Sequence, residues 1–323
     1  MKTLYNYIKE SVLDNIDVAV NRMDNDLLET CKQWLDSKKI SYTITANNDI
    51  RLRESIVISE PIPKYINIKY VPSITFNSTD SLYGAIPEII DKLYINDVVI
   101  ENFNMFKDKE LQLISIKGCD IRSLNGFPKK CGIVRIGDNR QHFNYKDIKK
   151  LVNTKYIYTL GHYESTYNCI LLGKNDINYI QQESDKLKNI LIKEIPEIKS
   201  VKTSAREGSS CLWFRLDFLI EQDHPHNISD NSIYLDFKYS IDTLSLEKSQ
   251  EGHLNLTPED KQGKYKYYAL KGFSAPYLDN GGKKFRKTKV EDFNAKQIAD
   301  KIIDWTKAVV KAALEDQGGE LKR

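Results

Sequence analysis

Three charged side chains on two neighbouring strand-like segments have the types and spacing to do chemistry. Asp217 lies in the apolar run "RLDFL", and Asp236 and Lys238 follow in "YLDFKYS". Because side chains alternate along a strand, Asp236 and Lys238 share one face, and a hairpin would bring Asp217 towards them. Two carboxylates can hold Mg²⁺, and a lysine can position or activate a water molecule. This pattern is therefore compatible with metal-assisted hydrolysis.

These residues resemble the D…DxK pattern of the PD-(D/E)xK nucleases. The resemblance implies a magnesium-dependent nuclease or related hydrolase, with Glu207 as a further acidic residue. The segment departs from that group because it lacks the parallel crossover connections of the nuclease core. A half-exposed hairpin with an Asp–Lys cross-strand ion pair produces the same pattern. Catalysis with Mg²⁺ therefore stays the alternative, and the main hypothesis includes no cofactor.

The other reactive residue types indicate no further catalytic or metal site. The five cysteines are scattered and none lies in a C-x-x-C pair, which predicts a reducing compartment without disulfides or zinc. His224 and His226 flank Pro225, where a solvated loop is a simpler interpretation than a metal site. Phosphate-loop, dinucleotide-binding and serine- or zinc-hydrolase motifs are absent from the sequence. These features favour a binding protein over an enzyme.

A basic segment near the C-terminus is a candidate binding loop. "NGGKKFRKTK" contains five cations in seven positions, next to Phe285. Such a loop can follow a phosphate backbone or dock on an acidic protein, so nucleic acid is a possible second partner. Neutralisation by Glu291 and Asp292 is the alternative, and a net charge of +3 does not decide between them. The cations are Lys283, Lys284, Arg286, Lys287 and Lys289.

The whole composition is that of a soluble globular protein. The chain has 323 residues, of which 41% are hydrophobic and 29% charged. This length predicts two domains, and no apolar run approaches the ~20 residues that span a bilayer. The first residues also lack the apolar core of a secretory signal. We therefore expect neither a membrane protein nor a secreted one.

The first 40 residues are expected to form a helical leader or cap. Apolar residues recur at helical spacing from Thr3 to Asp36, with a break near Asp14. Two short amphipathic helices follow from this pattern, the second of which includes Cys31 and Leu35.

Residues 41–173 contain short strand-like clusters at a regular spacing. Leu93, Leu113 and Ile133 are 20 residues apart, and each begins or lies in such a cluster. This period over about residues 55–165 resembles the leucine-rich-repeat family, although Ile often replaces Leu. The resemblance implies a curved solenoid of four or five short parallel strands that binds a protein partner. An ordinary sheet with evenly spaced strands is the alternative. The later clusters are "KLYIND" (92–97), "LISIKG" (113–118), "IVRIGD" (133–138) and "YIYTLG" (156–161), and the earlier ones are "SIVIS" (55–59), "YINIKY" (65–70) and "SITFN" (73–77), the last two on either side of Pro72.

Alternation along these strands predicts which side chains a partner would meet. A register error of one residue would exchange the two faces. The predicted buried set is Leu93, Ile95, Ile114, Ile116, Ile133 and Ile136. The predicted exposed, partner-binding set is Tyr94, Asn96, Ser115, Lys117, Arg135 and Tyr158.

Residues 174–323 are expected to form a separate α+β domain. A helix is predicted over 176–194 with Asp176 as its N-cap and Pro196 beyond its end. Several strands follow, and a final helix is predicted over about 294–315. This order predicts an antiparallel sheet with both helices on one face, so the whole chain is α+β.

The first ten residues, "MKTLYNYIKE", also resemble the capsid-targeting leaders of internal head proteins in T4-like tailed phages. Those leaders are cut after a glutamate in an I-x-E pattern, which implies cleavage after Glu10. The alternative is that this stretch docks on the solenoid as a cap. The sequence thus suggests a protein-binding phage protein, located in the virion or in the bacterial host cytoplasm.

Overall fold

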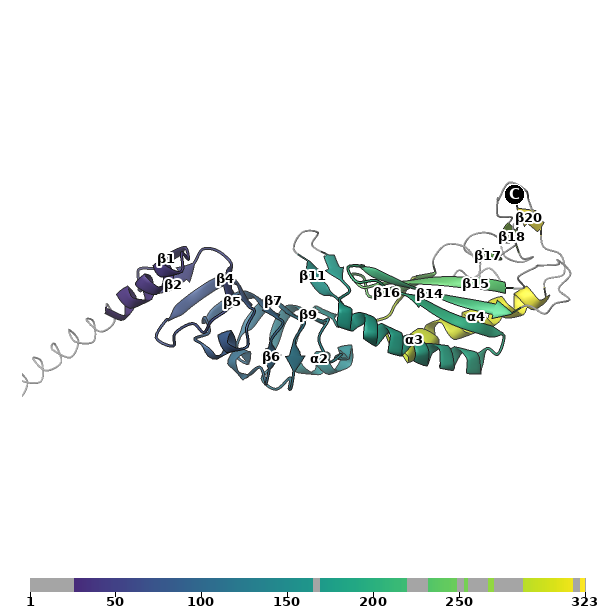
Figure 1. Ribbon diagram of the computed structural model, residues 1–323, viewed down its shortest axis with the longest axis horizontal. Coiled ribbons are helices and arrows are strands. Elements are labelled where there is room, and N and C mark those ends of the chain that lie inside the picture. The colour runs from purple at the N-terminus through teal and green to yellow at the C-terminus, as the bar shows by residue number, and fades with distance from the viewer. Residues whose placement is uncertain are drawn as a thin grey trace, which may run out of the picture. The chain divides into compact units, whose positions relative to one another are not determined.

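The chain forms two compact units of mixed helices and strands, which confirms the α+β class (Figure 1). The computed structural model describes residues 26–164, 169–219, 232–248, 253–254, 267–269, 287–315 and 320–322. The first unit is Met1–Val134 with Leu151–Lys155, and the second is Arg135–Lys150 with Tyr156–Arg323. This division falls earlier than residue 173, because Leu160 and Ile170 already belong to the hydrophobic core of the second unit.

The first unit is built on a mainly parallel sheet with strand order β1-β2-β4-β5-β7-β9, in which β3 lies beside β4. β1 pairs antiparallel with β2, whereas the pairs β2–β4, β3–β4, β4–β5 and β5–β7 are parallel. Ile74 of β4 pairs with Leu93 of β5, which pairs with Ile114 of β7. Neighbouring strands thus come from successive repeats. The strands are β1 (Tyr42–Ile44), β2 (Ile50–Leu52), β3 (Ile56–Ile58), β4 (Ile68–Phe76), β5 (Ile89–Asn96), β7 (Glu110–Lys117) and β9 (Lys130–Gly137).

Four segments of the chain share one spacing of inward side chains, at positions i, i+3, i+5 and i+8. In the first segment Thr79 takes the last position, and its Oγ1 accepts a hydrogen bond of 3.0 Å from the Val99 N–H. In the third, the Cys119 thiol donates to backbone carbonyls. The buried members are Val71, Ile74 and Phe76; Ile90, Leu93, Ile95 and Val98; Leu111, Ile114, Ile116 and Cys119; and Cys131, Val134, Ile136 and Asn139.

Each repeat returns through short irregular elements on the other side of the strands. These are η1 (Asp80–Tyr83), β6 (Val99–Ile100), η2 (Asn104–Phe106) and β8 (Asp120–Ile121). β6 and β8 pair in parallel, so the return segments also stack from repeat to repeat. Phe103 and Phe127 fill the space behind the sheet, with ring centroids 5.0 Å apart.

A residue with positive φ follows each of four strands and turns the chain into its return segment. The φ values are 56° at Asp97, 68° at Gly118, 54° at Asp138 and 77° at Gly161. Glycine adopts this left-handed region readily, and Asp does so more often than most residues. These four residues end the strand-like clusters at 92–97, 113–118, 133–138 and 156–161, which explains why each of these four clusters ends in Asp or Gly.

The described part of the N-terminal stretch is a helix over residues 26–37, as predicted for its second half. Cys31 and Leu35 are its buried residues, with 2% and 0% exposure. The Cys31 thiol lies 3.5 Å from the Tyr65 carbonyl oxygen, so this helix packs on the beginning of the first unit. Residues 1–25 lie outside the described residues.

The second unit contains an antiparallel sheet with strand order β13-β14-β15-β16-β19, in which β17 pairs with β15. The first elements of the second unit lie outside this sheet and are α2 (Tyr145–Leu151), β10 (Tyr156–Tyr158), β11 (His162–Glu164) and β12 (Cys169–Leu171). The sheet strands are β13 (Ile198–Ser204), β14 (Cys211–Leu219), β15 (Ser232–Ser240), β16 (Ser245–Lys248), β17 (His253–Leu254) and β19 (Thr288–Lys289). β18 (Tyr267–Ala269) pairs separately with β20 (Glu320–Lys322).

Two long helices, α3 (Lys174–Glu194) and α4 (Ala295–Glu315), cover one face of this sheet, as predicted (Figure 1). Phe214 and Phe237 stack with ring centroids 4.9 Å apart inside the core. One detail of the prediction is wrong. The N-cap of α3 is Gly173, and Asp176 lies at the third helical position instead.

No helix among the described residues is both long enough and apolar enough to cross a membrane.

Candidate functional site

The sheet of the first unit has a face opposite its core, which we call the strand face. Its central row is formed by Val57, Thr75, Tyr94 and Ser115, which pair in this order across β3, β4, β5 and β7. Val57 is 66% exposed, and Thr75 and Tyr94 are half-buried. The strand face therefore presents an apolar and an aromatic side chain on either side of Thr75, in one row across regular strands.

The predicted burial is wrong for two residues of this sheet. Ser115 points to the strand face but is only 4% exposed, because its small side chain lies beside the much larger Tyr94. Ile133 is half-buried, and its neighbour Val134 takes the fully buried position. The equivalent residues are Leu93, Ile114 and Val134, so the true offsets are 21 and 20 residues. Asn96 and Lys117 pair on the strand face and are half-buried.

The other two predicted binding residues belong to the second unit. Arg135 lies on the last part of β9, with its guanidinium carbon 6.0 Å from the centroid of the Tyr158 ring. Tyr158 in turn stacks on Tyr156, with ring centroids 6.5 Å apart. Within that unit, Arg135 and Tyr158 form a half-buried cation–π pair.

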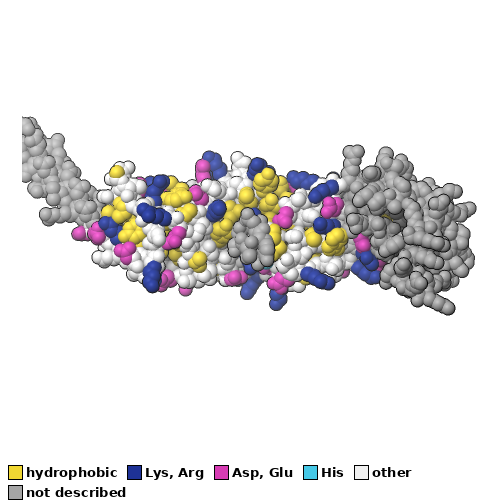
Figure 2. Space-filling view, turned by 90° about the horizontal axis from the view of Figure 1, so that it is seen from above, with side chains coloured by type: hydrophobic (Ala, Val, Ile, Leu, Met, Phe, Trp, Pro, Cys, Tyr) yellow, Lys and Arg dark blue, Asp and Glu magenta, His cyan; other side chains and the backbone are white. Residues whose placement is uncertain are grey.

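The basic loop is described only at its end. Lys283, Lys284 and Arg286 lie outside the described residues. Lys287 and Lys289 are exposed, and their ammonium groups lie 3.8 Å from Glu247 and 3.1 Å from Glu291. Lys287 and Lys289 are therefore paired with the carboxylates of Glu247 and Glu291. On the face seen in Figure 2, basic and acidic side chains are interspersed in the same way.

Asp217, Asp236 and Lys238 lie on the exposed face of the second unit's sheet, as alternation predicted. Asp236 forms a two-pronged ion pair with Arg215, at 2.8 and 3.1 Å. Each of the other two has a different partner. Lys202 lies 2.8 Å from Asp217, and Glu247 lies 3.6 Å from Lys238. This arrangement is that of cross-strand ion pairs, and Glu207 is exposed in the turn before β14.

The described residues contain no group of three or more His, Cys, Asp or Glu side chains that could hold a metal ion. Two cysteine thiols are also unsuited to nucleophilic chemistry. Burial raises the pKa of Cys119 and of Cys131 to about 11, so both are protonated at neutral pH. His224 and His226 lie outside the described residues.

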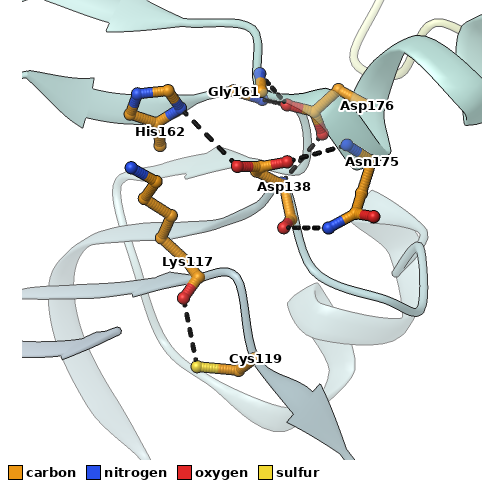
Figure 3. Close-up of polar contacts among 8 residues, drawn as sticks. Lys117, Cys119, Asp138, Gly161, His162, Asn175 and Asp176 are labelled. Carbon is orange, nitrogen blue, oxygen red and sulfur yellow. Dashed lines mark hydrogen bonds and ion pairs between the residues drawn. The ribbon is translucent and has the colours of Figure 1, made fainter. Parts of the chain in front are cut away.

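A polar cluster that sequence reasoning missed lies at the start of α3 (Figure 3). The Asp176 carboxylate accepts hydrogen bonds from the backbone N–H groups of Asp138, Gly161 and Gly173, at 2.8, 2.9 and 2.8 Å. The Asp138 carboxylate accepts one of 2.9 Å from the Asn175 N–H. Its other oxygen lies 4.0 Å from His162 Nδ1. Two buried carboxylates thus join the end of β9, the turn at Gly161 and the start of α3.

The ionisation of this region reflects its burial. Burial raises the pKa of Asp176 to about 6, and the neighbouring Asp138 charge adds to this effect, while the three N–H donors oppose it. Burial lowers the pKa of His142 to about 4, so its imidazole is neutral at pH 7. The His142 ring stacks on Tyr179 with centroids 3.4 Å apart.

The end of β9 with the loop after it, Thr159 after β10 and the first turns of α3 line a pocket in the second unit. The space open to the centres of water molecules in it is about 140 Å³. Its lining is mostly polar and includes Asn139, His142, Asn175, Asn178 and Gln182. A sequence signal existed for part of it, because Asn139 occupies the repeat position that Cys119 occupies one repeat earlier. The remaining residues meet only through tertiary structure.

No family model, no curated protein and no solved structure matches this chain. Glu10, the residue after which cleavage is predicted, lies outside the described residues.

Proposed function

We propose that this protein binds a protein partner through the strand face of its first unit. The observation that carries the proposal is the row in which Val57, Thr75 and Tyr94 lie side by side, with Val57 66% exposed. Interfaces are enriched in aromatic residues, and exposed apolar side chains on rigid strands can be buried at little entropic cost. Lys92 and Asn96 lie next to this row and provide polar contacts.

We further propose that the first unit is a leucine-rich-repeat solenoid. The spacing of buried residues at i, i+3, i+5 and i+8 supports this, because it is the L-x-x-L-x-L-x-x-N/C spacing of that family. Cys119 and Asn139 occupy the N/C position. Repeat proteins of this kind bind partners on extended faces, which agrees with a role for the strand face.

The charge pattern favours a protein over a nucleic acid as the partner. Nucleic-acid-binding faces carry clustered cations, whereas the strand face combines Lys92 and Lys117 with uncharged Thr75, Tyr94 and Asn96. The net charge of the whole chain is only +3.

The test is affinity capture with the immobilised full chain from a lysate of bacteria in which the protein is expressed. Tyr94→Ala and Val57→Asp should reduce recovery of the captured protein at least about tenfold. The matched control is Tyr83→Ala, which removes an aromatic side chain that is 55% exposed on η1, in a return segment. Equal recovery by wild type and Tyr94→Ala, with both proteins folded by circular dichroism, would overturn the proposal.

The resemblance of the first ten residues supports a further part of the proposal, that the protein is encoded by a tailed phage and enters the virion or acts in the bacterial cytoplasm. The N-terminal residue of the protein in purified virions tests this part of the proposal.

A further inference from the structure

The polar pocket of the second unit is large enough to hold a small molecule. Its volume of about 140 Å³ holds roughly ten water molecules, since one needs about 10–15 Å³ measured in this way. Drug-sized ligands occupy larger clefts, so the pocket matches a small molecule.

Buried hydrogen bonds hold the wall of the pocket in place. The Asp138 N–H donates to Asp176, and the Asn175 side-chain amide donates to the Asp138 carbonyl oxygen at 2.9 Å. Asp138 also has a positive φ of 54°, which directs the following residues over α3. These contacts fix the loop against the start of α3, so the wall of the pocket is pre-organised for binding.

The lining excludes a charged ligand of either sign. An anion would approach the carboxylates of Asp138 and Asp176, with Arg140 as the one cation of the lining. A cation would compete with the hydrogen bonds that both carboxylates already accept from backbone N–H groups. Metal binding is further opposed because the described residues include no group of three metal-ligating side chains.

The same lining suits neutral hydroxyl groups. Side-chain amides, which both donate and accept hydrogen bonds, come from two elements: Asn139 and Gln141 on the loop, and Asn175, Asn178 and Gln182 on α3. His142 also lines the pocket, and its buried Nε2 has no hydrogen-bond partner in the described part of the chain. A buried polar atom without a partner costs free energy, so a hydroxyl that reaches it is favoured.

We propose that this pocket binds one neutral molecule rich in hydroxyl groups, of the size of a single monosaccharide. This site lies within the second unit and does not depend on the strand face. The amides of Asn178 and Gln182 on α3 and the imidazole of His142 would contact different hydroxyls, which makes recognition dependent on the stereochemistry of the sugar.

Saturation-transfer NMR and isothermal titration calorimetry on the full chain would test this proposal. The probes are glucose, galactose and N-acetylglucosamine, with inorganic phosphate and glucosamine as charged comparisons. At least one neutral sugar should bind, with the charged probes at least about tenfold weaker. Failure of all three neutral sugars to bind, or tighter binding of phosphate, would overturn the proposal.

Variants on α3 locate the site. Gln182→Leu and Asn178→Leu should weaken sugar binding about tenfold or more, because each replaces an amide of the lining by an apolar group. The matched control, Gln181→Leu, alters an exposed amide on the same helix that does not line the pocket, and should leave affinity unchanged. Binding that is equally strong in all three variants would contradict this location.

Discussion

At the scale of single residues, burial sets the protonation of the polar cluster in the second unit. Asp176 and His142 are both shifted towards their neutral forms, which gives them opposite effects on stability. Between about pH 4 and 6, folded Asp176 binds a proton that the unfolded chain releases, so its contribution to stability decreases as pH rises. Over much of the same range, unfolded His142 binds a proton that the folded chain does not, so its contribution increases with pH. The two contributions therefore oppose each other.

The His142→Gln substitution should expose this opposition. The free energy of unfolding of the wild type, minus that of the variant, should fall as pH drops from 6.5 to about 4, because wild-type unfolding then takes up a proton. The change is at most about 3 kcal/mol, because burial lowers the pKa of His142 from its usual 6.5 to about 4. Urea unfolding at several pH values measures it, and a difference that does not vary with pH would contradict the assignment.

The exposed ion pairs lead to a second prediction at this scale. Asp236 is held by Arg215, so we expect no Mg²⁺-dependent cleavage of single- or double-stranded nucleic acid by the purified protein. Asp236→Ala should lower the free energy of unfolding by about 1 kcal/mol or less, since the Arg215 side chain is 42% exposed. Cleavage that wild type performs and Asp236→Ala does not would instead support the nuclease hypothesis.

At the scale of elements, close contact between return segments sets where glycine is needed. Gly126 follows β8 with a φ of 77°, and a Cβ there would lie 2.6 Å from the Asn104 Cα of the preceding repeat. Gly208, in the turn before β14, has nearly the same φ of 76°, yet a Cβ there would meet no atom within 4 Å. A substitution at Gly208 therefore tests backbone strain alone, and one at Gly126 tests backbone strain together with steric overlap.

Replacing each glycine by alanine should therefore give unequal losses of stability. Gly208→Ala should cost about 1–2 kcal/mol, from the left-handed backbone alone. Gly126→Ala should cost about 1–3 kcal/mol more, because backbone atoms of Asn104 must move. Urea unfolding followed by circular dichroism measures both, and equal losses would show that the return segments adjust without cost.

Asp292 joins elements within the second unit. Its carboxylate is fully buried and accepts hydrogen bonds from the Tyr145 N–H at the start of α2 and from Thr159 Oγ1, the latter at 2.6 Å. Asp292→Ala leaves both donors unpaired, which should lower the free energy of unfolding by about 2–4 kcal/mol. Asp300→Ala, on the exposed side of α4, is the control and should change it little. Similar losses in both variants would contradict the role of Asp292.

At the scale of the whole molecule, the two units carry two different proposals, partner binding on the strand face and sugar binding in the polar pocket. Each has its own core, with Leu93 and Ile114 central to the first and Phe214 and Phe237 to the second. Variants at the strand face should therefore leave sugar binding unchanged, and those at the pocket should leave partner capture unchanged.

The proposed cleavage after Glu10 gives the prediction that tests the phage proposal. If the protein is processed during capsid assembly, its form in purified virions begins at Ser11, directly after Glu10. Mass spectrometry of virion proteins measures this terminus, and Glu10→Ala should leave the full-length chain. A virion form that keeps Met1 would contradict cleavage, and absence from virions would contradict packaging.

The sequence by itself determined the type and order of most elements. Alternation and helical spacing are local properties, so α3 and α4 were predicted to within two residues of their observed starts, and the strands around Leu93 and Ile114 were found. Pro72 was an exception. The sequence on either side of it predicts two strands, whereas β4 continues through it from Ile68 to Phe76.

The tertiary structure alone decided register and the composition of the sites. The offset between β5 and β7 is 21 residues, because the inward positions of neighbouring repeats must stack, and a count between apolar letters misses this by one. The pocket depends on contacts between residues far apart in the chain, such as Asp138 with Asn175. Nothing local requires such pairs to meet. When they meet, segments far apart in the chain supply hydrogen-bond donors to the buried carboxylates: Asp138 and Gly161 donate to Asp176, and Asn175 donates to Asp138.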